Sequence, residues 1–187
     1  INSILYIPWA WPNDDFESCE EWINNSMNQH KKVKITTTKK IELPEKMKKY
    51  DAIYIGGGNT FKLLKMLRDT GLDKELIKLY EDGKTIYGGS AGTLIWGFDI
   101  KTSLICSDKD KNLVKIKNTN GLNKIANRDL QVHFNRDQIL EHQEYSKKTD
   151  RSIIAIPEES ALLVTENRFK VIGEKPITYI TKNEYKG

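Results

Sequence analysis

Residues 85–92 read Thr-Ile-Tyr-Gly-Gly-Ser-Ala-Gly and join a short β-branched and aromatic run to a pentapeptide of the form G-x-S-x-G. The run is typical of a buried strand, and the small residues after it permit a sharp turn into a helix. In such a turn the serine projects from the carboxyl end of the strand, and the first amides of the next helix gather behind it. The stretch predicts a nucleophile elbow with Ser90 as the nucleophile.

A second glycine-rich turn, Gly56 to Thr60, strengthens this interpretation. It follows the apolar run Ala52–Ile55 and opens an amphipathic stretch from Phe61 to Leu67. The G-x-S-x-G pattern alone also fits an ordinary glycine-rich turn between a strand and a helix. Two such junctions in a parallel sheet, however, lie together at the carboxyl ends of the strands, where α/β folds form their ligand crevice.

A nucleophilic serine needs a base, and imidazole is the usual one because its pKa lies near neutral pH. The chain has 3 histidines. His30 lies in a lysine-rich stretch and His142 in a polar helical run, so both are predicted to be solvent-exposed. His133 closes the strand-like run from Leu130 and is the best candidate for the base. The alternative is a strand histidine that only hydrogen-bonds its neighbours.

A carboxylate should hold the imidazole. Glu158 follows the strand-like run 152–156 and Pro157, which places it at the carboxyl end of a strand, and Glu159 comes next. An ordinary α/β-hydrolase instead has the order serine, acid, histidine. Four aspartates would suit that order, namely Asp99, Asp108, Asp110 and Asp129. Spacing alone does not choose between the two arrangements.

These motifs, taken in order, resemble those of the aspartyl dipeptidase (peptidase E) family of serine peptidases. The segments that carry the resemblance are 55–61 (IGGGNTF), 88–92 (GGSAG), His133-Phe134, and 156–162 (IPEESAL), and the match runs from about Asn2 to the C-terminus. Cyanophycinases share the same motif set. The resemblance implies a Ser-His-Glu triad on a sheet related to class I glutamine amidotransferases. It places the nucleophile at Ser90, the base at His133 and the acid at Glu158.

The resemblance further implies oxyanion donors at the backbone amides of Ala91 and of Gly57 or Gly58. It implies cleavage of dipeptides with an N-terminal aspartate, whose carboxylate needs a cationic partner. Family members carry an arginine between the histidine and the glutamate, but here neither Arg136 nor Arg151 falls in register. The alternative for both is a solvated surface position. The candidate substrate-binding residues are Asn59, Arg136 and Arg151.

Two other functions stay open. One is a cyanophycinase-like or other small-peptide hydrolase, and the other is a catalytically silent binder of a small molecule or peptide. The family usually has a further strand and helix before the first residue of this chain, so we expect that an N-terminal strand and helix are lacking.

The expected fold is α/β: a mostly parallel sheet flanked by helices, class I glutamine amidotransferase-like with a flavodoxin-like core, and a C-terminal antiparallel β extension. We expect a single catalytic domain over residues 1–187, with an irregular segment at 98–128. Strands are predicted at 3–7, 33–37, 52–55, 84–87, 130–134, 153–156, 161–165, 169–173 and 177–181. Helices are predicted at 15–28, 60–69, 73–82, 91–96 and 136–148.

Composition limits the partners. The 30 basic residues are interspersed with 26 acidic ones, which argues against a nucleic-acid groove despite the net charge of +4. No signal peptide, membrane-spanning stretch, metal-ligand spacing or phosphate-binding loop is evident, so we expect no membrane, metal or cofactor. Cys19 and Cys106 fit reduced thiols. We expect a cytoplasmic monomer or homodimer acting on a small peptide substrate.

Overall fold

The computed structural model describes residues 1–27, 33–38, 44–105, 109–165 and 168–186. The chain divides into two compact units. Unit 1 comprises Ile1–Gly92 and Asn112–Lys115, and unit 2 comprises Thr93–Lys111 and Ile116–Gly187. Each unit has a sheet of its own. That residues 1–187 form a single catalytic domain stays a prediction.

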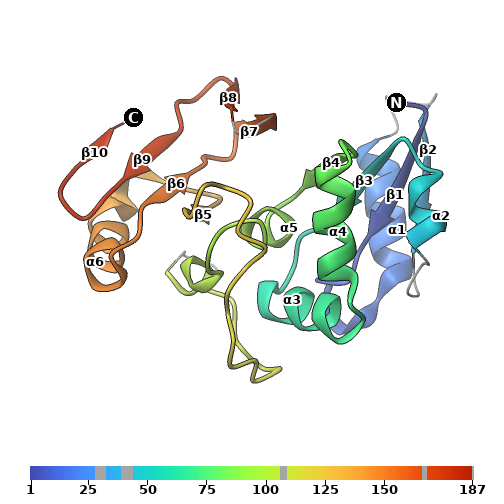
Figure 1. Ribbon diagram of the computed structural model, residues 1–187, viewed down its shortest axis with the longest axis horizontal. Coiled ribbons are helices and arrows are strands. Elements are labelled where there is room, and N and C mark those ends of the chain that lie inside the picture. Colours follow the sequence, from blue (N-terminus) through green and yellow to red (C-terminus); the bar gives the residue numbers. More distant parts are fainter. Residues whose placement is uncertain (28–32, 39–43, 106–108, 166–167, 187) are drawn as a thin grey trace. The chain divides into compact units, whose positions relative to one another are not determined.

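Unit 1 is built on a parallel sheet of four strands in the order β2-β1-β3-β4 (Figure 1). The strands are β1 (Ser3–Ile7), β2 (Lys34–Thr37), β3 (Ala52–Ile55) and β4 (Thr85–Gly88). The register places Tyr6 opposite Tyr54, and Tyr54 opposite Tyr87. Because all four strands are parallel, the turns after β3 and β4 lie at the same edge of the sheet.

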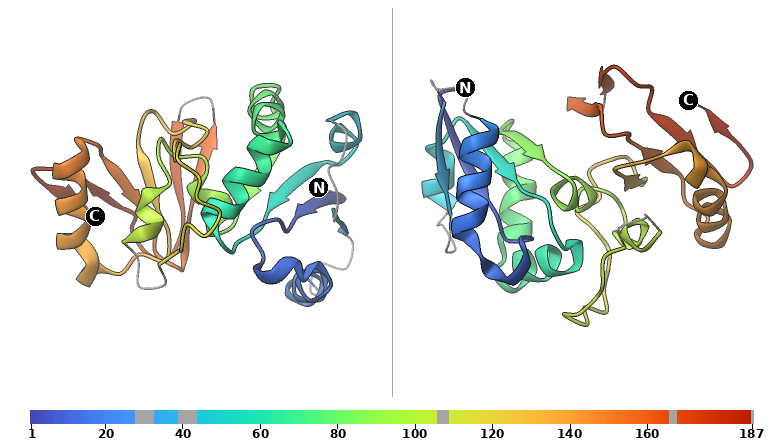
Figure 2. Two further views of the ribbon diagram at one scale, coloured as in Figure 1. Left: turned by 90° about the horizontal axis from the view of Figure 1, so that it is seen from below. Right: turned by 180° about the vertical axis from the view of Figure 1, so that it is seen from behind.

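Helices cover both faces of this sheet, as Figures 1 and 2 show. The helices are α1 (Phe16–Ser26), α2 (Pro44–Lys48), α3 (Thr60–Asp69) and α4 (Leu72–Glu81). The helix α1 begins at a capping carboxylate, since Asp15 accepts a hydrogen bond from the Ser18 amide at 3.1 Å. Its side chains Cys19 and Ile23 pack against Tyr6. On α3 the apolar residues recur at helical spacing, and Phe61, Leu64 and Leu67 are buried.

Unit 2 begins within the short helix α5 (Ala91–Leu94), which directly follows Ser90. Its sheet has the order β10-β9-β6-β5, in which β5 and β6 are parallel and the other pairs antiparallel. The strands are β5 (Asp129–Gln131), β6 (Ile153–Ala155), β9 (Thr178–Ile180) and β10 (Tyr185–Lys186). The helix α6 (Ile139–Thr149) connects β5 to β6, and its Ile139 packs with Phe134, Ile153 and Ile180.

The strands β7 (Ser160–Thr165) and β8 (Arg168–Gly173) form a separate antiparallel pair. The predicted α/β class is therefore confirmed, with a parallel sheet flanked by helices and antiparallel strands near the C-terminus. Every helix in the described part of the chain is too short or too polar to cross a membrane.

Most predicted elements lie within a residue or two of the observed ones, and the differences have local causes. The predicted strand 130–134 ends at Gln131, because His133 has a left-handed backbone with a φ of 53°. The predicted helix at 136–148 begins with a 3-10 turn at Arg136–Gln138. Two observed elements were not predicted, α2 and β10, which are only 5 and 2 residues long. The end of the helix predicted at 15–28 lies outside the described residues.

Candidate active site

Ser90 occupies a strained turn between β4 and α5. Its φ is 50°, a left-handed value that is uncommon for a residue with a side chain. Two hydrogen bonds hold the turn: the Gly89 amide donates to the Ile55 carbonyl at 2.9 Å, and the Gly92 amide donates to the Gly89 carbonyl at 2.9 Å. The turn therefore has the sharp geometry that the glycine-rich sequence predicts, with Ser90 at its apex.

The turn after β3 lies directly against Ser90. A Cβ atom added at Gly57 would lie 3.0 Å from the Cβ atom of Ser90 and 3.6 Å from its Oγ atom. Gly58 has a φ of 130°, and a Cβ atom there would overlap with the carbonyl of Ala10. Glycine is thus required at position 58, a side chain at position 57 would crowd Ser90, and the structure brings the two predicted glycine-rich turns together.

Backbone hydrogen bonds also fix the edges of the turn after β3. The Gly56 amide donates to the Ile7 carbonyl at 2.9 Å, and the Asn59 amide donates to the Ala10 carbonyl at 2.8 Å. The Gly57 amide lies between these two anchored positions, and the Ala91 amide lies between the anchored Gly89 and Gly92 of the other turn. The side chain of Asn59 caps α3, since its Oδ1 atom accepts from the Lys62 amide at 2.9 Å. This predicted substrate-binding residue therefore also has a clear local role.

A row of tyrosines supports the two turns from one face of the sheet. Tyr6 and Tyr54 contact edge to face with ring centroids 5.0 Å apart, and Tyr54 and Tyr87 do so at 4.6 Å. The hydroxyl of Tyr54 lies 2.9 Å from where a Cβ atom of Gly89 would be. Burial raises the pKa of Tyr54 to about 12, so its hydroxyl stays neutral at physiological pH. A side chain at Gly89 would therefore press against Tyr54 and displace its hydroxyl.

In unit 2, His133 and Glu158 are hydrogen-bonded to each other through Nδ1 and Oε2. A carboxylate can only accept a hydrogen bond, so Nδ1 of His133 carries the proton that is donated to Glu158. The Phe134 amide donates to the Ile156 carbonyl at 3.1 Å, which ties the residue after His133 to the strand that precedes Glu158. The side chains of His133 and Glu158 are 53% and 71% exposed, so the pair is open to solvent.

The neighbouring Glu159 has a different partner. Its carboxylate lies 2.6 Å from the ammonium of Lys175, and this hydrogen bond lowers the pKa of Glu159. Of the two adjacent glutamates, only Glu158 contacts the histidine in the described part of the chain.

Comparison with known proteins then identifies the family. Residues 2–172 match the model of peptidase family S51. The chain belongs to this family.

The curated relatives of this chain are peptidases. The chain is 24% identical to a peptidase E of Haemophilus influenzae over 191 residues, which covers 97% of this chain and 79% of that protein. It is 38% identical to an uncharacterized peptidase of Listeria monocytogenes over 84 residues, which covers 45% of this chain and 40% of that protein. The predicted resemblance to the peptidase E family is confirmed, and the chain is a hydrolase of peptidase type by family.

Solved structures show the same fold. The crystal structure of a putative peptidase E protein from Listeria monocytogenes matches with a TM-score of 0.74 and 24% identity, and the match covers 93% of this chain and 87% of that one. A peptidase from an acI-B1 actinobacterium matches with a TM-score of 0.68 and 19% identity over 98% of this chain and 82% of that one.

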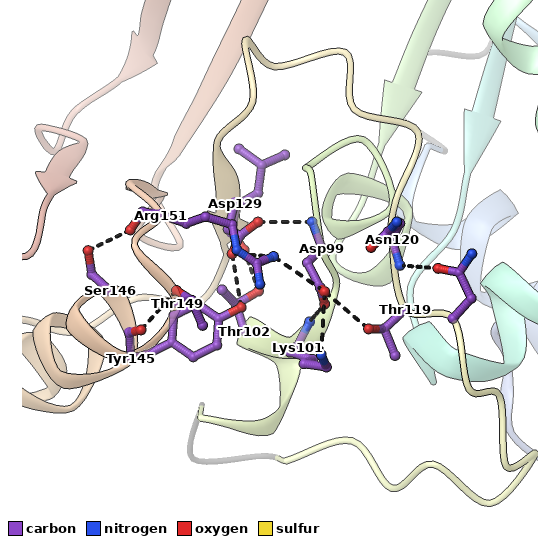
Figure 3. Close-up of polar contacts among 12 residues, drawn as sticks. Asp99, Lys101, Thr102, Thr119, Asn120, Asp129, Tyr145, Ser146, Thr149 and Arg151 are labelled. Atoms are coloured by element: carbon purple, nitrogen blue, oxygen red, sulfur yellow. Dashed lines mark hydrogen bonds and ion pairs between the residues drawn. The ribbon is translucent and has the colours of Figure 1, made fainter.

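The aspartates considered as alternative acids lie elsewhere in this S51 chain. Asp99 and Asp129 are buried and gather around Arg151 (Figure 3). The Nη1 atom of Arg151 lies 3.3 Å from Oδ2 of Asp99 and 3.6 Å from Oδ2 of Asp129. The amide of Asp110 donates to the Ser103 carbonyl at 3.0 Å, and Asp108 lies outside the described residues.

The two arginines predicted to bind substrate are therefore in different situations. Arg151 is 20% exposed, and its guanidinium is engaged by two buried carboxylates. Arg136 is exposed at the first position of a 3-10 turn, three residues after His133. Sequence reasoning missed the association of Arg151 with Asp99 and Asp129, because these residues lie far apart along the chain and carry no motif.

The prediction that His142 is solvent-exposed was wrong. His142 is fully buried, its Nδ1–H donates to the Gln138 carbonyl at 2.8 Å, and its ring meets Phe134 edge to face. It shares the inward side of α6 with Ile139 and Ser146, at helical spacing, although its neighbours in sequence are polar. His30 lies outside the described residues.

No group of three or more His, Cys, Asp or Glu side chains within the described ranges could hold a metal ion. The residues that the structure does bring together are those of the Ser90 turn with Gly57 in unit 1, and those of the His133–Glu158 pair in unit 2.

Proposed function

We propose that this chain hydrolyses small peptides through an acyl-enzyme on Ser90, with His133 as the base and Glu158 as the third member of the triad. The observation that carries the proposal is the hydrogen bond between Nδ1 of His133 and Glu158. In a serine triad the carboxylate holds the histidine in one tautomer, so that the other ring nitrogen can accept the serine proton. Membership of peptidase family S51 supports the same assignment.

In this mechanism Nε2 of His133 takes the proton of the Ser90 hydroxyl as Oγ attacks the scissile carbonyl carbon. The amides of Ala91 and of Gly57 or Gly58 stabilise the oxyanion. His133 then gives the proton to the leaving amine as the C–N bond breaks. Water, deprotonated by the same nitrogen, hydrolyses the ester and releases Ser90. Fixed amide dipoles favour this role, since they stabilise developing charge without reorganising.

The backbone of Ser90 supports its assignment as the nucleophile. A φ of 50° costs free energy for a serine, and such strain clusters at functional sites. The positive φ and the position after β4 support a nucleophile elbow, in which the turn presents the hydroxyl at the carboxyl end of a strand. Gly57 and Gly89 make the turn sterically possible.

The proposed substrates are dipeptides with an N-terminal aspartate. The cation that would bind the substrate carboxylate is Arg136, because it is exposed and follows His133 closely, whereas Arg151 is already engaged in ion pairs with Asp99 and Asp129. That engagement of Arg151 favours a second candidate, a small-peptide hydrolase that does not require an N-terminal aspartate.

A panel of dipeptides that differ in their N-terminal residue tests the proposal. Ser90→Ala and His133→Ala should each lower kcat by about 10³-fold or more, and Glu158→Gln by less. The matched control is Glu159→Gln, which should leave kcat/KM unchanged because Glu159 pairs with Lys175. Full turnover by Ser90→Ala would end the proposal.

The panel also separates the candidates. Cleavage confined to N-terminal aspartate, and lost in Arg136→Met, would support the aspartyl dipeptidase assignment. Cleavage across the panel would support the broader hydrolase. No cleavage together with no labelling of Ser90 by a serine-reactive fluorophosphonate would point to a silent binder.

A further inference from the structure

A buried polar network surrounds Asp129 in unit 2, and Figure 3 shows its members. Oδ1 of Asp129 accepts from the Asp99 amide at 2.9 Å, and Oδ2 accepts from the Tyr145 hydroxyl at 2.9 Å. Oδ2 of Asp99 in turn accepts from the Thr119 hydroxyl at 3.1 Å. Arg151 lies within ion-pair distance of both carboxylates. The network thus joins one guanidinium to two carboxylates that are almost entirely buried, and the Lys101 ammonium lies 3.6 Å from Oδ2 of Asp99.

The network lies at the amino end of the two strands that carry the His133–Glu158 pair. Asp129 is the first residue of β5, and Arg151 comes two residues before β6. His133 follows the carboxyl end of β5 by two residues, and Glu158 follows that of β6 by three. Since β5 and β6 are parallel neighbours, any shift of one strand along the other changes both ends together.

A ladder of backbone hydrogen bonds connects the two ends. The Asp129 amide donates to the Ser152 carbonyl at 2.9 Å, and the Ile156 amide donates to the Gln131 carbonyl at 2.8 Å. The ladder continues to the bond from Phe134 to Ile156, directly beside His133. The relative position of His133 and Glu158 is therefore set by the register of β5 and β6.

Apolar side chains do not specify this register. From Ile153 to Ile156 the strand is apolar at every position, as buried parallel strands commonly are. A shift of β6 by two residues, about 6.6 Å, that placed residues 155–157 opposite β5 would still present apolar groups there. It would, however, separate Arg151 from Asp129 and also Glu158 from His133.

We infer that Asp129 and Arg151 are positioning residues: by their buried ion pair with each other they select the register of β5 and β6 that brings Glu158 onto Nδ1 of His133. Neither residue belongs to the reacting groups. They act through the strands, at the opposite end from the pair.

The physical cost of the network fits this role. Burial raises the pKa of Asp129, against the opposing effects of the Tyr145 hydroxyl and Arg151, so ionised Asp129 is held at a cost. Buried ion pairs are often no more stabilising than apolar side chains of the same volume, but they can restrict a fold to one arrangement. Tyr145 and Ser146 extend that restriction to α6, since Oγ of Ser146 donates to the Arg151 carbonyl at 2.5 Å.

The test reads the His133–Glu158 pair itself in Asp129→Asn and Arg151→Met. The ¹⁵N shifts of the His133 ring, detected through its carbon-bound protons and assigned with His133→Gln, report which nitrogen holds the proton when imidazole is neutral. We expect a fixed Nδ1–H form in the parent protein and a mixture of tautomers in both variants. Arg151→Lys should restore part of the fixed form. In turnover, kcat should fall by about 10-fold or more with KM unchanged.

Asp150→Asn is the matched control, because Asp150 is adjacent to Arg151 but pairs with Lys182 at the surface, at 2.6 Å. It should leave the His133 shifts unchanged. Folding of each variant is checked by circular dichroism, and if Arg151→Met does not fold, Asp129→Asn decides. Folded variants with the tautomer of the parent protein would overturn the inference.

The inference rests on the proposed function for its effect on kcat, but the ring shifts need no substrate. Activity in Ser90→Ala would end the proposed mechanism without changing the result of the shift measurement. Unchanged shifts in a protein that loses activity on Ser90→Ala would end only the positioning role.

Discussion

The two parallel strand pairs that end in candidate active-site residues are held together in different ways. Between β3 and β4 the backbones approach so closely that glycine is required, and the Ser90 turn rests on the carbonyl of Ile55. Between β5 and β6 the distinguishing contacts are polar side chains, an ion pair of Asp129 with Arg151 at one end and a hydrogen bond of His133 with Glu158 at the other. One site is thus specified by the absence of side chains, and the other by polar contacts between residues distant in sequence.

The strongest test of this difference is Gly92→Ala. In an exposed helix the change would favour folding by about 1 kcal/mol. Here a Cβ atom at Gly92 would overlap with the carbonyl oxygen of Ile55, a backbone atom that cannot move without breaking its bond to the Gly89 amide. We expect a loss of about 3 kcal/mol in the free energy of unfolding, measured by urea denaturation.

Gly83→Ala is the matched control. Gly83 has a φ of 82°, but no atom lies within 4 Å of its missing Cβ. The change should therefore cost only the left-handed backbone strain, about 1 kcal/mol. If the two variants were equally stable, close backbone approach would not be what specifies the Ser90 turn.

The corresponding test of the β5–β6 pair is Arg151→Met. It leaves Asp99 and Asp129 buried without the guanidinium of Arg151. We expect a loss of about 3 kcal/mol in the free energy of unfolding near neutral pH. The loss should be smaller than that of Gly92→Ala if water enters the site. Burial already raises the pKa of Asp129, and the loss of Arg151 raises it further. When the pKa of a carboxyl is higher in the folded than in the unfolded protein, the free energy of unfolding falls as the pH rises through the folded pKa.

The stability difference between Arg151→Met and the parent protein should consequently shrink as the pH falls from neutral toward about 4, where unfolded aspartate titrates. Urea denaturation at a series of pH values measures it. The exposed pair Lys182–Asp150 provides the control, since Lys182→Met should show no such trend. A difference that stays constant with pH would mean that Asp129 is not held ionised by Arg151.

The same contrast explains what the sequence could predict. Glycine-rich turns after apolar runs are local patterns, so the positions of β3, β4, α3 and Ser90 followed directly from them. Glu158 was separated from Glu159 only through the family resemblance, and the structure then placed Glu158 against His133. The network of Asp99, Asp129 and Arg151 has no local signature, because each of its residues is also common in solvated loops.

His142 shows the limit of composition as a guide to burial. Its neighbours Glu141, Gln143 and Glu144 are polar, yet it lies on the side of α6 that packs against Phe134. The residues that flank a buried helical position in sequence point to solvent, so their polarity carries no information about that position. Spacing from Ile139 to Ser146 was the signal that could have indicated burial.

The smallest of the expected effects concerns this histidine and opposes that of Asp129 in sign. Burial lowers the pKa of His142 below its unfolded value, against the raising effect of the hydrogen bond to the Gln138 carbonyl. Its contribution to stability is therefore complete above the unfolded pKa of about 6.5 and is lost as the pH falls through the folded pKa. In His142→Leu that acid-dependent loss should disappear, whereas in Arg151→Met acidification restores part of the lost stability.

Urea denaturation of the parent protein and His142→Leu from neutral to mildly acid pH separates the contribution of His142 from that of Asp129. If His142→Leu lost as much stability on acidification as the parent protein, the acid sensitivity of unit 2 would have to come from other groups, and the buried imidazole would be a packing residue alone.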